Sequence, residues 1–265
     1  MNKKDKLGQR MKENYENRAK TSLLRRTPVI IRIDGRAFHT FTKGFDRPFD
    51  KNLSNAMDLT TIELCKNIQG CVLGYTQSDE ITLLLNDYET LDACAWFDYD
   101  VQKLCSICAS MATLYFNRAF ESVVTQLNGS LPIGDEQMGA EAVKTLQSYN
   151  KSMSQGAMFD ARCFNVPREE VLNCILWRVK DCIKNSAFTY ARAHFPHSRL
   201  QGKDSSTMKE MVLNEHGKDW AEDLAVRDKY GTFVVKDNGS FDIVNTPIES
   251  YSDLDKFIKV FNVPI

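Results

Sequence analysis

The order of the predicted elements indicates an α+β fold with a β-α-β-β-α-β core. Four segments rich in apolar and β-branched residues are predicted strands, at 28–33, 71–76, 80–85 and 159–165. Segments of helical periodicity separate the first strand from the second and the third from the fourth. This is the ferredoxin-like arrangement. It places the first strand beside the hairpin of the second and third strands, at the centre of the sheet.

The first strand sets the geometry of a candidate site. The sequence PVIIRIDGRAFH, residues 28–39, runs from a β-branched stretch straight into Asp34 and Gly35. The strand would fix the carboxylate, and the glycine would allow a sharp turn that brings a backbone carbonyl or amide to a ligand. Alternation predicts one apolar face that carries helices and a second, open face that admits substrate. These faces contain Val29, Ile31 and Ile33, and Ile30, Arg32 and Asp34, respectively.

Two helices are predicted between the strands. The first spans residues 51–69, with Asp50 as its N-cap and Gly70 at its end. The second, over 99–127, carries so few charged side chains that it should be buried almost all round. A sheet alone cannot cover such a helix, so the pattern indicates an oligomer interface. The polar segment 129–154 is predicted to be irregular.

The C-terminal third adds a different mixture of elements. A helix over 168–187 opens after Pro167, which suits the first helical position. Since neither a repeat nor a low-complexity linker interrupts the chain, we expect a catalytic domain over 1–190, headed by a basic helix at 3–20. Residues 191–265 would be a small α/β extension packed on it. The extension contains a helix at 208–215, a hairpin of 232–236 with 241–244 around the turn 237–240, and a terminal helix at 252–261.

Composition is that of an ordinary soluble globular protein. Hydrophobic residues make up 43% of the chain and charged residues 26%. No apolar run approaches the roughly 18 residues of a membrane-spanning helix, and residues 1–20 resemble neither a signal peptide nor a transit peptide. We therefore expect a cytoplasmic protein with no membrane partner. Its eight cysteines then act as small apolar side chains, including the pair Cys105 and Cys108.

The net charge of −1 conceals an asymmetry. Residues 1–26 carry nine Lys and Arg against three acids, and residues 178–209 carry seven against two. Two basic segments on an acidic body suit a polyanion that binds at a defined place, although either segment alone is more typical of a solvated helix face. Arg25 and Arg26 are the candidate RNA-binding residues of the first segment.

A second carboxylate supports a metal site beside the first strand. An Asp-Gly pair after a strand is by itself more typical of an ordinary turn. Asp79, however, lies in the predicted hairpin turn and could face Asp34. Two converging carboxylates repel each other unless a divalent cation lies between them. This geometry suits two Mg²⁺ ions, one that activates an attacking oxygen and one that neutralises a triphosphate.

The motifs RIDGRAFHTFTKGF, YTQSDE, WRVKDC and RLQGK followed by MKEM resemble those of the tRNA(His) guanylyltransferase family and its guanylyltransferase-like relatives. The resemblance covers nearly the whole chain. It implies a core similar to the palm of polymerases and to nucleotide cyclases, and a Mg²⁺-dependent enzyme that adds nucleotides in the 3′→5′ direction to the 5′ end of tRNA. It also implies ATP and GTP or another NTP as substrates, and a homotetramer.

The resemblance also implies roles for particular residues. The metal ligands would be the carboxylates of Asp34 and Asp79 and the backbone carbonyl of Gly35. Glu80 would join Asp34 and Asp79 as a catalytic residue, and Phe38 could lie against a base or sugar. Lys209 would contact RNA phosphate. The nucleotide-binding residues would be Asp34, Gly35, Arg36, Ala37, Phe38, His39, Arg47, Ser78 and Asp79.

One departure from the family bears on the substrate. Enzymes dedicated to tRNA(His) carry His-Ile-Asn-Asn where this chain has Ile183, Lys184, Asn185 and Ser186. The missing histidine favours the guanylyltransferase-like branch, which extends 5′-truncated tRNAs using the opposite strand as template. A dedicated enzyme that adds one guanosine to tRNA(His) is the alternative. Less favoured are an RNA-binding module without catalysis, which has no use for three acids, and a nucleotide cyclase, which has no use for two basic segments.

Overall fold

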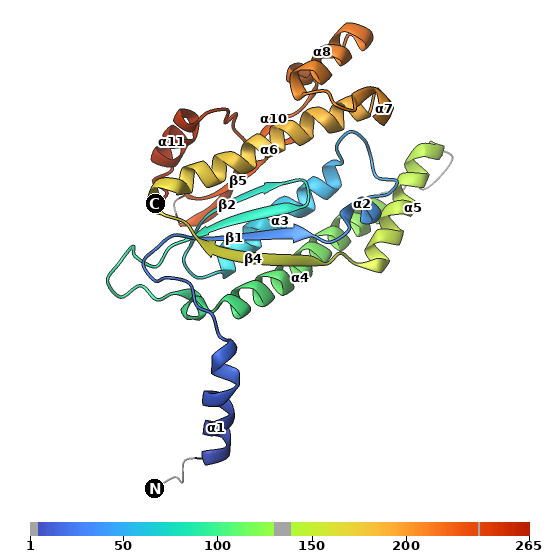
Figure 1. The fold of residues 1–265 in the computed structure, drawn as a ribbon. Helices are drawn as coiled ribbons and strands as arrows, with labels where there is room; N and C mark the ends of the chain where they lie inside the picture. The colour runs from blue at the N-terminus through green and yellow to red at the C-terminus, as the bar shows by residue number, and fades with distance from the viewer. Residues whose placement is uncertain (1–4, 130–138, 238) are drawn as a thin grey trace.

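A mixed α/β architecture surrounds one antiparallel sheet (Figure 1). The computed structural model describes residues 5–129, 139–237 and 239–265. Strand order is β4-β1-β3-β2-β5-β6, so β1 and β3 lie side by side as predicted. Lys3 and Lys4 of the basic segment and Asn238 of the predicted turn lie outside the described residues. The strands are β1 (Val29–Gly35), β2 (Cys71–Gln77), β3 (Glu80–Leu85), β4 (Phe159–Asn165), β5 (Thr232–Asp237) and β6 (Ser240–Val244).

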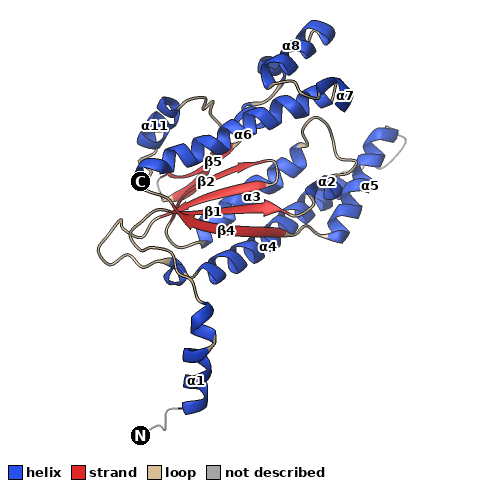
Figure 2. Ribbon diagram, viewed as in Figure 1, coloured by secondary structure: helices blue, strands red, loops and turns tan. Residues whose placement is uncertain are grey.

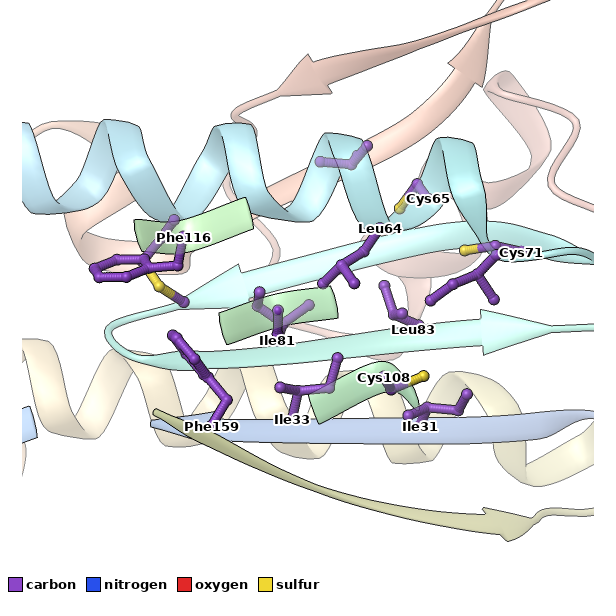
Figure 3. Close-up of a cluster of buried hydrophobic side chains, with 14 of the residues drawn as sticks. Ile31, Ile33, Leu64, Cys65, Cys71, Ile81, Leu83, Cys108, Phe116 and Phe159 are labelled. Atoms are coloured by element: carbon purple, nitrogen blue, oxygen red, sulfur yellow. The ribbon is translucent and has the colours of Figure 1, made fainter. Parts of the chain in front are cut away.

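Helices α3 (Lys51–Asn67) and α4 (Val101–Gly129) cover the face of the sheet that was predicted to carry helices. On this face Ile31 and Ile33 have no exposed surface and belong to one core with Leu64 of α3 (Figure 3). Asp50 caps α3 as predicted, because its carboxylate accepts the N–H of Leu53 at 2.9 Å. The pattern of the first strand therefore identifies this core correctly.

The opposite face of the sheet is not open, so that expectation is wrong. Helices α6 (Val171–Arg192) and α11 (Tyr251–Val260) lie over it (Figure 2). Ile30 of β1 and Tyr75 of β2 are buried in this second core. Every residue of β2 and of β3 is buried, which is the burial expected of strands covered on both faces rather than one. Substrate must therefore approach at an end of the sheet.

The long helix is buried along one stripe only, which also differs from the expectation. Its buried side chains recur every four residues, while Leu114 is 46% and Ile107 is 38% exposed. The segment predicted to be irregular contains helix α5 (Ala140–Gln155). Leu146 and Tyr149 of α5 pack on the first core. A mostly polar segment can form a helix because a single stripe of apolar residues at helical spacing is enough to pack on a core.

The C-terminal segment extends the same sheet, because β5 pairs with β2 and β6 with β5. Between α6 and β5, four short helices pack around a third apolar cluster that includes Trp220 and Tyr230. These helices are α7 (His197–Leu200), α8 (Ser205–His216), α9 (Trp220–Asp223) and α10 (Val226–Tyr230).

Helix α1 (Lys6–Asn14) projects from the body and has no buried residue (Figure 1). The predicted surface helix is thus confirmed over its described part. Within the described ranges, no helix combines the length and the apolar character needed to cross a membrane. The remaining short helices are α2 (Phe38–Phe41) and three 3₁₀ turns, η1 (Glu16–Ala19), η2 (Trp96–Tyr99) and η3 (Arg168–Glu170).

Candidate active site

A cavity of about 570 Å³ opens where β1 ends and the β2–β3 hairpin turns. Segments far apart in the chain form its wall: the turn after β1, the hairpin, the middle of α6, and α10. In Figure 1 this is the end of the sheet that faces α2. The polar side chains of the wall include Asp34, His39, Arg47, Ser78, Asp79, Asn185, Ser186, Thr189, Arg227 and Asp228.

The two predicted metal-binding segments are joined through the backbone. The N–H of Gly35 donates to the carbonyl oxygen of Asp79 at 3.0 Å, and Asp34 lies opposite Glu80 in the β1–β3 ladder. Gly35 is required here because a Cβ atom would lie 2.3 Å from the ring of Phe38. The structure thus brings Asp34, Gly35 and Asp79 together, as the sequence predicts.

Two residues in the wall have backbone conformations that non-glycine residues rarely adopt. Ala37 has φ 55° and Ser78 has φ 49°, in the left-handed region that disfavours a Cβ atom. The hydroxyl of Ser78 donates to the carboxylate of Asp79 at 3.0 Å. Such strain persists only where surrounding contacts enforce it, and it gathers at ligand sites. These turns therefore support the location of the site.

The electrostatics of the two aspartates suit a cation. Burial raises the pKa of Asp34 above its ordinary value, and the carboxylates of Glu80 and Asp160 raise it further. Burial also raises the pKa of Asp79, with a further contribution from Asp34. A divalent cation would relieve this repulsion. No cluster of three or more His, Cys, Asp or Glu suited to a metal occurs in the described part of the chain. With the carbonyl of Gly35 as the third predicted ligand, the donor set would consist of hard oxygens, which would fit Mg²⁺.

Glu80, the third predicted acid, does not line the cavity. Its carboxylate accepts hydrogen bonds from Nε and Nη2 of Arg178 at 2.6 and 2.8 Å, and from Nη2 of Arg32 at 2.7 Å. Arg178 of α6 is itself buried and also donates to Asp181 at 2.8 Å. These bonds connect β1 and β3 to α6. Glu80 therefore holds the helix in place beside Asp79, and its catalytic role stays a prediction.

The residues expected to bind a nucleotide differ in whether they line the cavity and in how exposed they are. His39 and Arg47 are exposed and line the cavity. Arg36 does not line it, and its N–H donates to the carbonyl of Met158 at 2.8 Å. The ring of Phe38 is 5% exposed and packs in an aromatic cluster in the core. Because Phe38 also lies in the cavity wall, a contact of that ring with a base or sugar stays a prediction.

Two of the three predicted RNA-binding residues make contacts within the protein. Arg25 pairs with the buried carboxylate of Asp87 at 2.5 Å and with Asp98 at 3.1 Å, and these contacts raise its pKa. The ammonium of Lys209 lies 3.2 Å from the ring centroid of Trp220, where burial lowers its pKa. Arg26 is exposed. Of the three, Arg26 is thus the most accessible to an external phosphate.

Part of the cavity wall lies outside the predicted site residues. Asn185, Ser186 and Thr189 share one face of α6, and this spacing of polar residues could have identified them. Arg227 reaches the wall from α10, where its guanidinium donates to Asp58 and to the carbonyl of Ser54, both at 3.0 Å. Nothing local in the sequence indicates that position, because it depends on how β5 pairs with β2.

The sequence profile of the tRNAHis guanylyltransferase (Thg1) family matches residues 8–167, which include β1, the hairpin and β4. The chain belongs to the tRNA(His) guanylyltransferase family. It is accordingly an enzyme, a nucleotidyltransferase, as the resemblance in its motifs implied. The α6 and α10 walls of the cavity lie beyond the matched residues.

Solved structures extend this similarity over the remaining walls. A bacterial tRNA(His) guanylyltransferase (Thg1)-like protein in complex with ATP is 35% identical, with a TM-score of 0.79 over 98% of this chain and 100% of that one. A second such structure, in complex with GTP, is 32% identical with a TM-score of 0.71 over the same shares. Uncharacterized protein R259 of Acanthamoeba polyphaga mimivirus is 28% identical over 98% of this chain and 85% of its own length.

Proposed function

We propose that this guanylyltransferase-family chain adds nucleotides in the 3′→5′ direction to the 5′ end of tRNA, and that it repairs 5′-truncated tRNAs by copying the opposite strand. The observation that carries the proposal is the cavity in which Asp34, Gly35 and Asp79 meet. The similar bacterial proteins solved with ATP and with GTP support a nucleoside triphosphate as the ligand of this cavity.

The proposed reaction has two steps. The tRNA 5′-phosphate first attacks the α-phosphate of ATP, which forms a 5′-adenylyl species and releases pyrophosphate. The 3′-OH of the incoming NTP then attacks the activated 5′-phosphate and displaces AMP. Asp34, Asp79 and the carbonyl of Gly35 would hold Mg²⁺, which when bound neutralises charge on the phosphates. The chain itself mainly positions the groups. Arg47, exposed in the cavity, can pair with the triphosphate, and Ser78 orients Asp79.

The proposed preference for truncated tRNA is based on α6. Ile183, which replaces the histidine of dedicated enzymes, packs against two apolar cores and does not line the cavity. Ser186 does line it, but its hydroxyl accepts the indole N–H of Trp220 at 3.0 Å. A site with fewer free polar groups discriminates less by hydrogen bonding. Base pairing with the opposite strand would then decide which nucleotide is added.

The test compares kcat/KM for two substrates under one set of conditions. One is a tRNA without its first nucleotide, and the other is intact tRNA(His) as an acceptor for an extra guanosine. We expect the truncated tRNA to be preferred, for several tRNA species, with insertion of whichever nucleotide pairs. A clear preference for intact tRNA(His), with guanosine added opposite any base, would support the dedicated enzyme instead.

Two broader expectations belong to the same proposal. The order β4-β1-β3-β2 with α3 and α4 on one face supports a ferredoxin-like core related to the palm of polymerases. The exposed apolar residues Ile107 and Leu114 on α4 support assembly through that helix, for which a cytoplasmic homotetramer is our expectation. Sedimentation of the purified chain would measure the subunit number.

A further inference from the structure

A second polar surface adjoins Asp34 on the side of β4, outside the cavity. In the β1–β4 ladder Asp34 lies opposite Asp160, and Arg32 lies opposite Arg162. The guanidinium of Arg162 is 3.0 Å from the Asp160 carboxylate and 3.7 Å from that of Asp34. The side chains of Asp34 and Arg162 are 46% and 53% exposed. Asp34 is thus accessible to solvent beside an arginine as well as from the cavity.

An exposed tryptophan lies next to this surface. Trp177 of α6 is 51% exposed, whereas Trp96 and Trp220 are 9% and 6% exposed. The guanidinium carbons of Arg32 and Arg178 lie 5.0 and 4.5 Å from the centroid of its ring.

These two arginines are immobilised by their bonds to Glu80. The indole therefore has a rigid support and a large accessible surface, a combination typical of a stacking site.

Contacts connect the tryptophan to the catalytic aspartate. The ring of Trp177 packs on Arg32, and Arg32 neighbours Arg162 across the ladder, where Cβ atoms are typically about 5 Å apart. Arg162 in turn reaches Asp34. Arg36 lies at the same strand end, where its N–H donates to the carbonyl of Met158. An aromatic ring and two exposed arginines thus flank Asp34 outside the nucleotide cavity.

We propose that Trp177 and Arg162 bind the terminal 5′ nucleotide of the RNA acceptor. Its base stacks on the indole, and its 5′-phosphate pairs with Arg162 and so is directed to Asp34. This inference rests on the proposed function. It also answers a geometric need, because two substrates must meet at Asp34 and the proposed function assigns the cavity to the nucleoside triphosphate. Unpaired ends of RNA are commonly bound by such stacking together with arginine contacts to phosphate.

Fluorescence of the wild-type protein provides the first test, because Trp177 is the exposed tryptophan. A 5′-monophosphorylated acceptor-stem RNA should quench this fluorescence, and ATP alone should not. The affinity of labelled RNA, measured by anisotropy, should fall about tenfold for Trp177→Ala and change little for Trp177→Phe, which keeps an aromatic ring. The affinity for ATP should be unchanged in both variants. The matched control is Tyr251→Ala, at a 47% exposed aromatic residue on α11.

The phosphate contact has its own test. Removal of the 5′-phosphate from the RNA should weaken binding to the wild type and make no further difference to Arg162→Ala. Lys259→Ala is the control, since Lys259 on α11 is also exposed and paired with a carboxylate, Asp255. Normal RNA affinity in folded Trp177→Ala and Arg162→Ala would overturn the proposal. So would quenching that follows protein concentration rather than RNA, because it would assign the surface to a subunit contact.

The outcomes separate this inference from the proposed function. If the wild type adds no nucleotide to any tRNA but RNA binding still depends on Trp177, the proposed function fails and the binding site stands. If nucleotide addition proceeds and Trp177→Ala binds RNA normally, the function stands and this site is wrong.

Discussion

Asp79 and Glu80 are consecutive acids with opposite surroundings. Asp79 lines the cavity, and burial raises its pKa; no ion pair involves it within the described part of the chain. Glu80 faces α6 and accepts three hydrogen bonds from Arg32 and Arg178. An acid that is kept without a basic partner reduces stability and is retained for a ligand, whereas a fully paired acid fixes the structure around it. We therefore expect Asp79 to bind a ligand and Glu80 to stabilise the structure around it.

The largest expected effect is on activity, when an acid that lines the cavity is removed. Asp34→Ala and Asp79→Ala should each lower kcat by more than ~100-fold, because loss of even an outer-shell partner of a metal site costs about 10- to 100-fold. Since both carboxyls have raised pKa values, the melting temperature without Mg²⁺ should not fall. Near-normal turnover by either variant would contradict the metal assignment. Asp242→Asn serves as a control at an exposed carboxylate of β6 that does not line the cavity.

The second effect is on stability, when the paired acid is removed. Glu80→Ala leaves the largely buried guanidinium of Arg32 without its carboxylate and that of Arg178 with Asp181 alone, and loss of a buried partner typically costs about 3–5 kcal/mol. Chemical denaturation would measure it. Glu80→Gln keeps the shape and one acceptor oxygen, so it should lose less stability and retain activity in proportion to the folded fraction. A Glu80→Gln protein of normal stability without activity would instead make Glu80 the catalytic acid that its motif implies.

The sequence predicts one half of the site well, for a physical reason. Asp34, Gly35, Ser78 and Asp79 lie in two short segments whose positions follow from a strand end and a hairpin turn. The α6 and α10 walls depend on helix packing and on the pairing of β5 with β2. For example, no local pattern places Arg227 at the cavity. These parts come from contacts between distant segments, which spacing alone does not reveal.

The points that the sequence leaves open have a common cause as well. Glu80 and Arg25 are charged residues in plausible motifs, and the sequence does not show that Arg178 and Asp87 will pair with them. The second face of the sheet was expected to be open because Arg32 alternates onto it. In the structure Arg32 is itself neutralised by Glu80 beneath α6. Predicting the function of a charge requires knowing whether the fold supplies its partner.

In its ion pairing Asp58 is intermediate between Asp79 and Glu80, because one arginine, Arg227, is its partner. Burial outweighs the nearby Arg227 and raises the pKa of Asp58 to about 6. Because the folded state then binds its proton more tightly than the unfolded state, Asp58 should make stability decrease as pH rises from about 4 to about 6. A shift of about two units corresponds to at most ~3 kcal/mol. Asp58→Asn should flatten this part of the curve in denaturation experiments, and an unaltered slope would refute the assignment.

The smallest expected effect is on the salt dependence of tRNA binding, and it compares a paired with an unpaired arginine. Arg25 is paired with Asp87 and Asp98, whereas the side chain of Arg26 is exposed and in no ion pair within the described ranges. Arg26→Ala should therefore reduce the slope of log K for tRNA against log[salt] by about one and leave the melting temperature unchanged.

Arg25→Ala should lower the melting temperature and leave the salt slope unchanged, because it leaves the buried carboxylate of Asp87 without its guanidinium. Both variants are to be compared by tRNA binding over a series of KCl concentrations, with thermal unfolding of each protein alone. If Arg25→Ala lowered the salt slope without loss of stability, Arg25 would have to leave Asp87 and contact RNA phosphate in the complex. The division between structural and ligand-binding charges would then not hold at this surface.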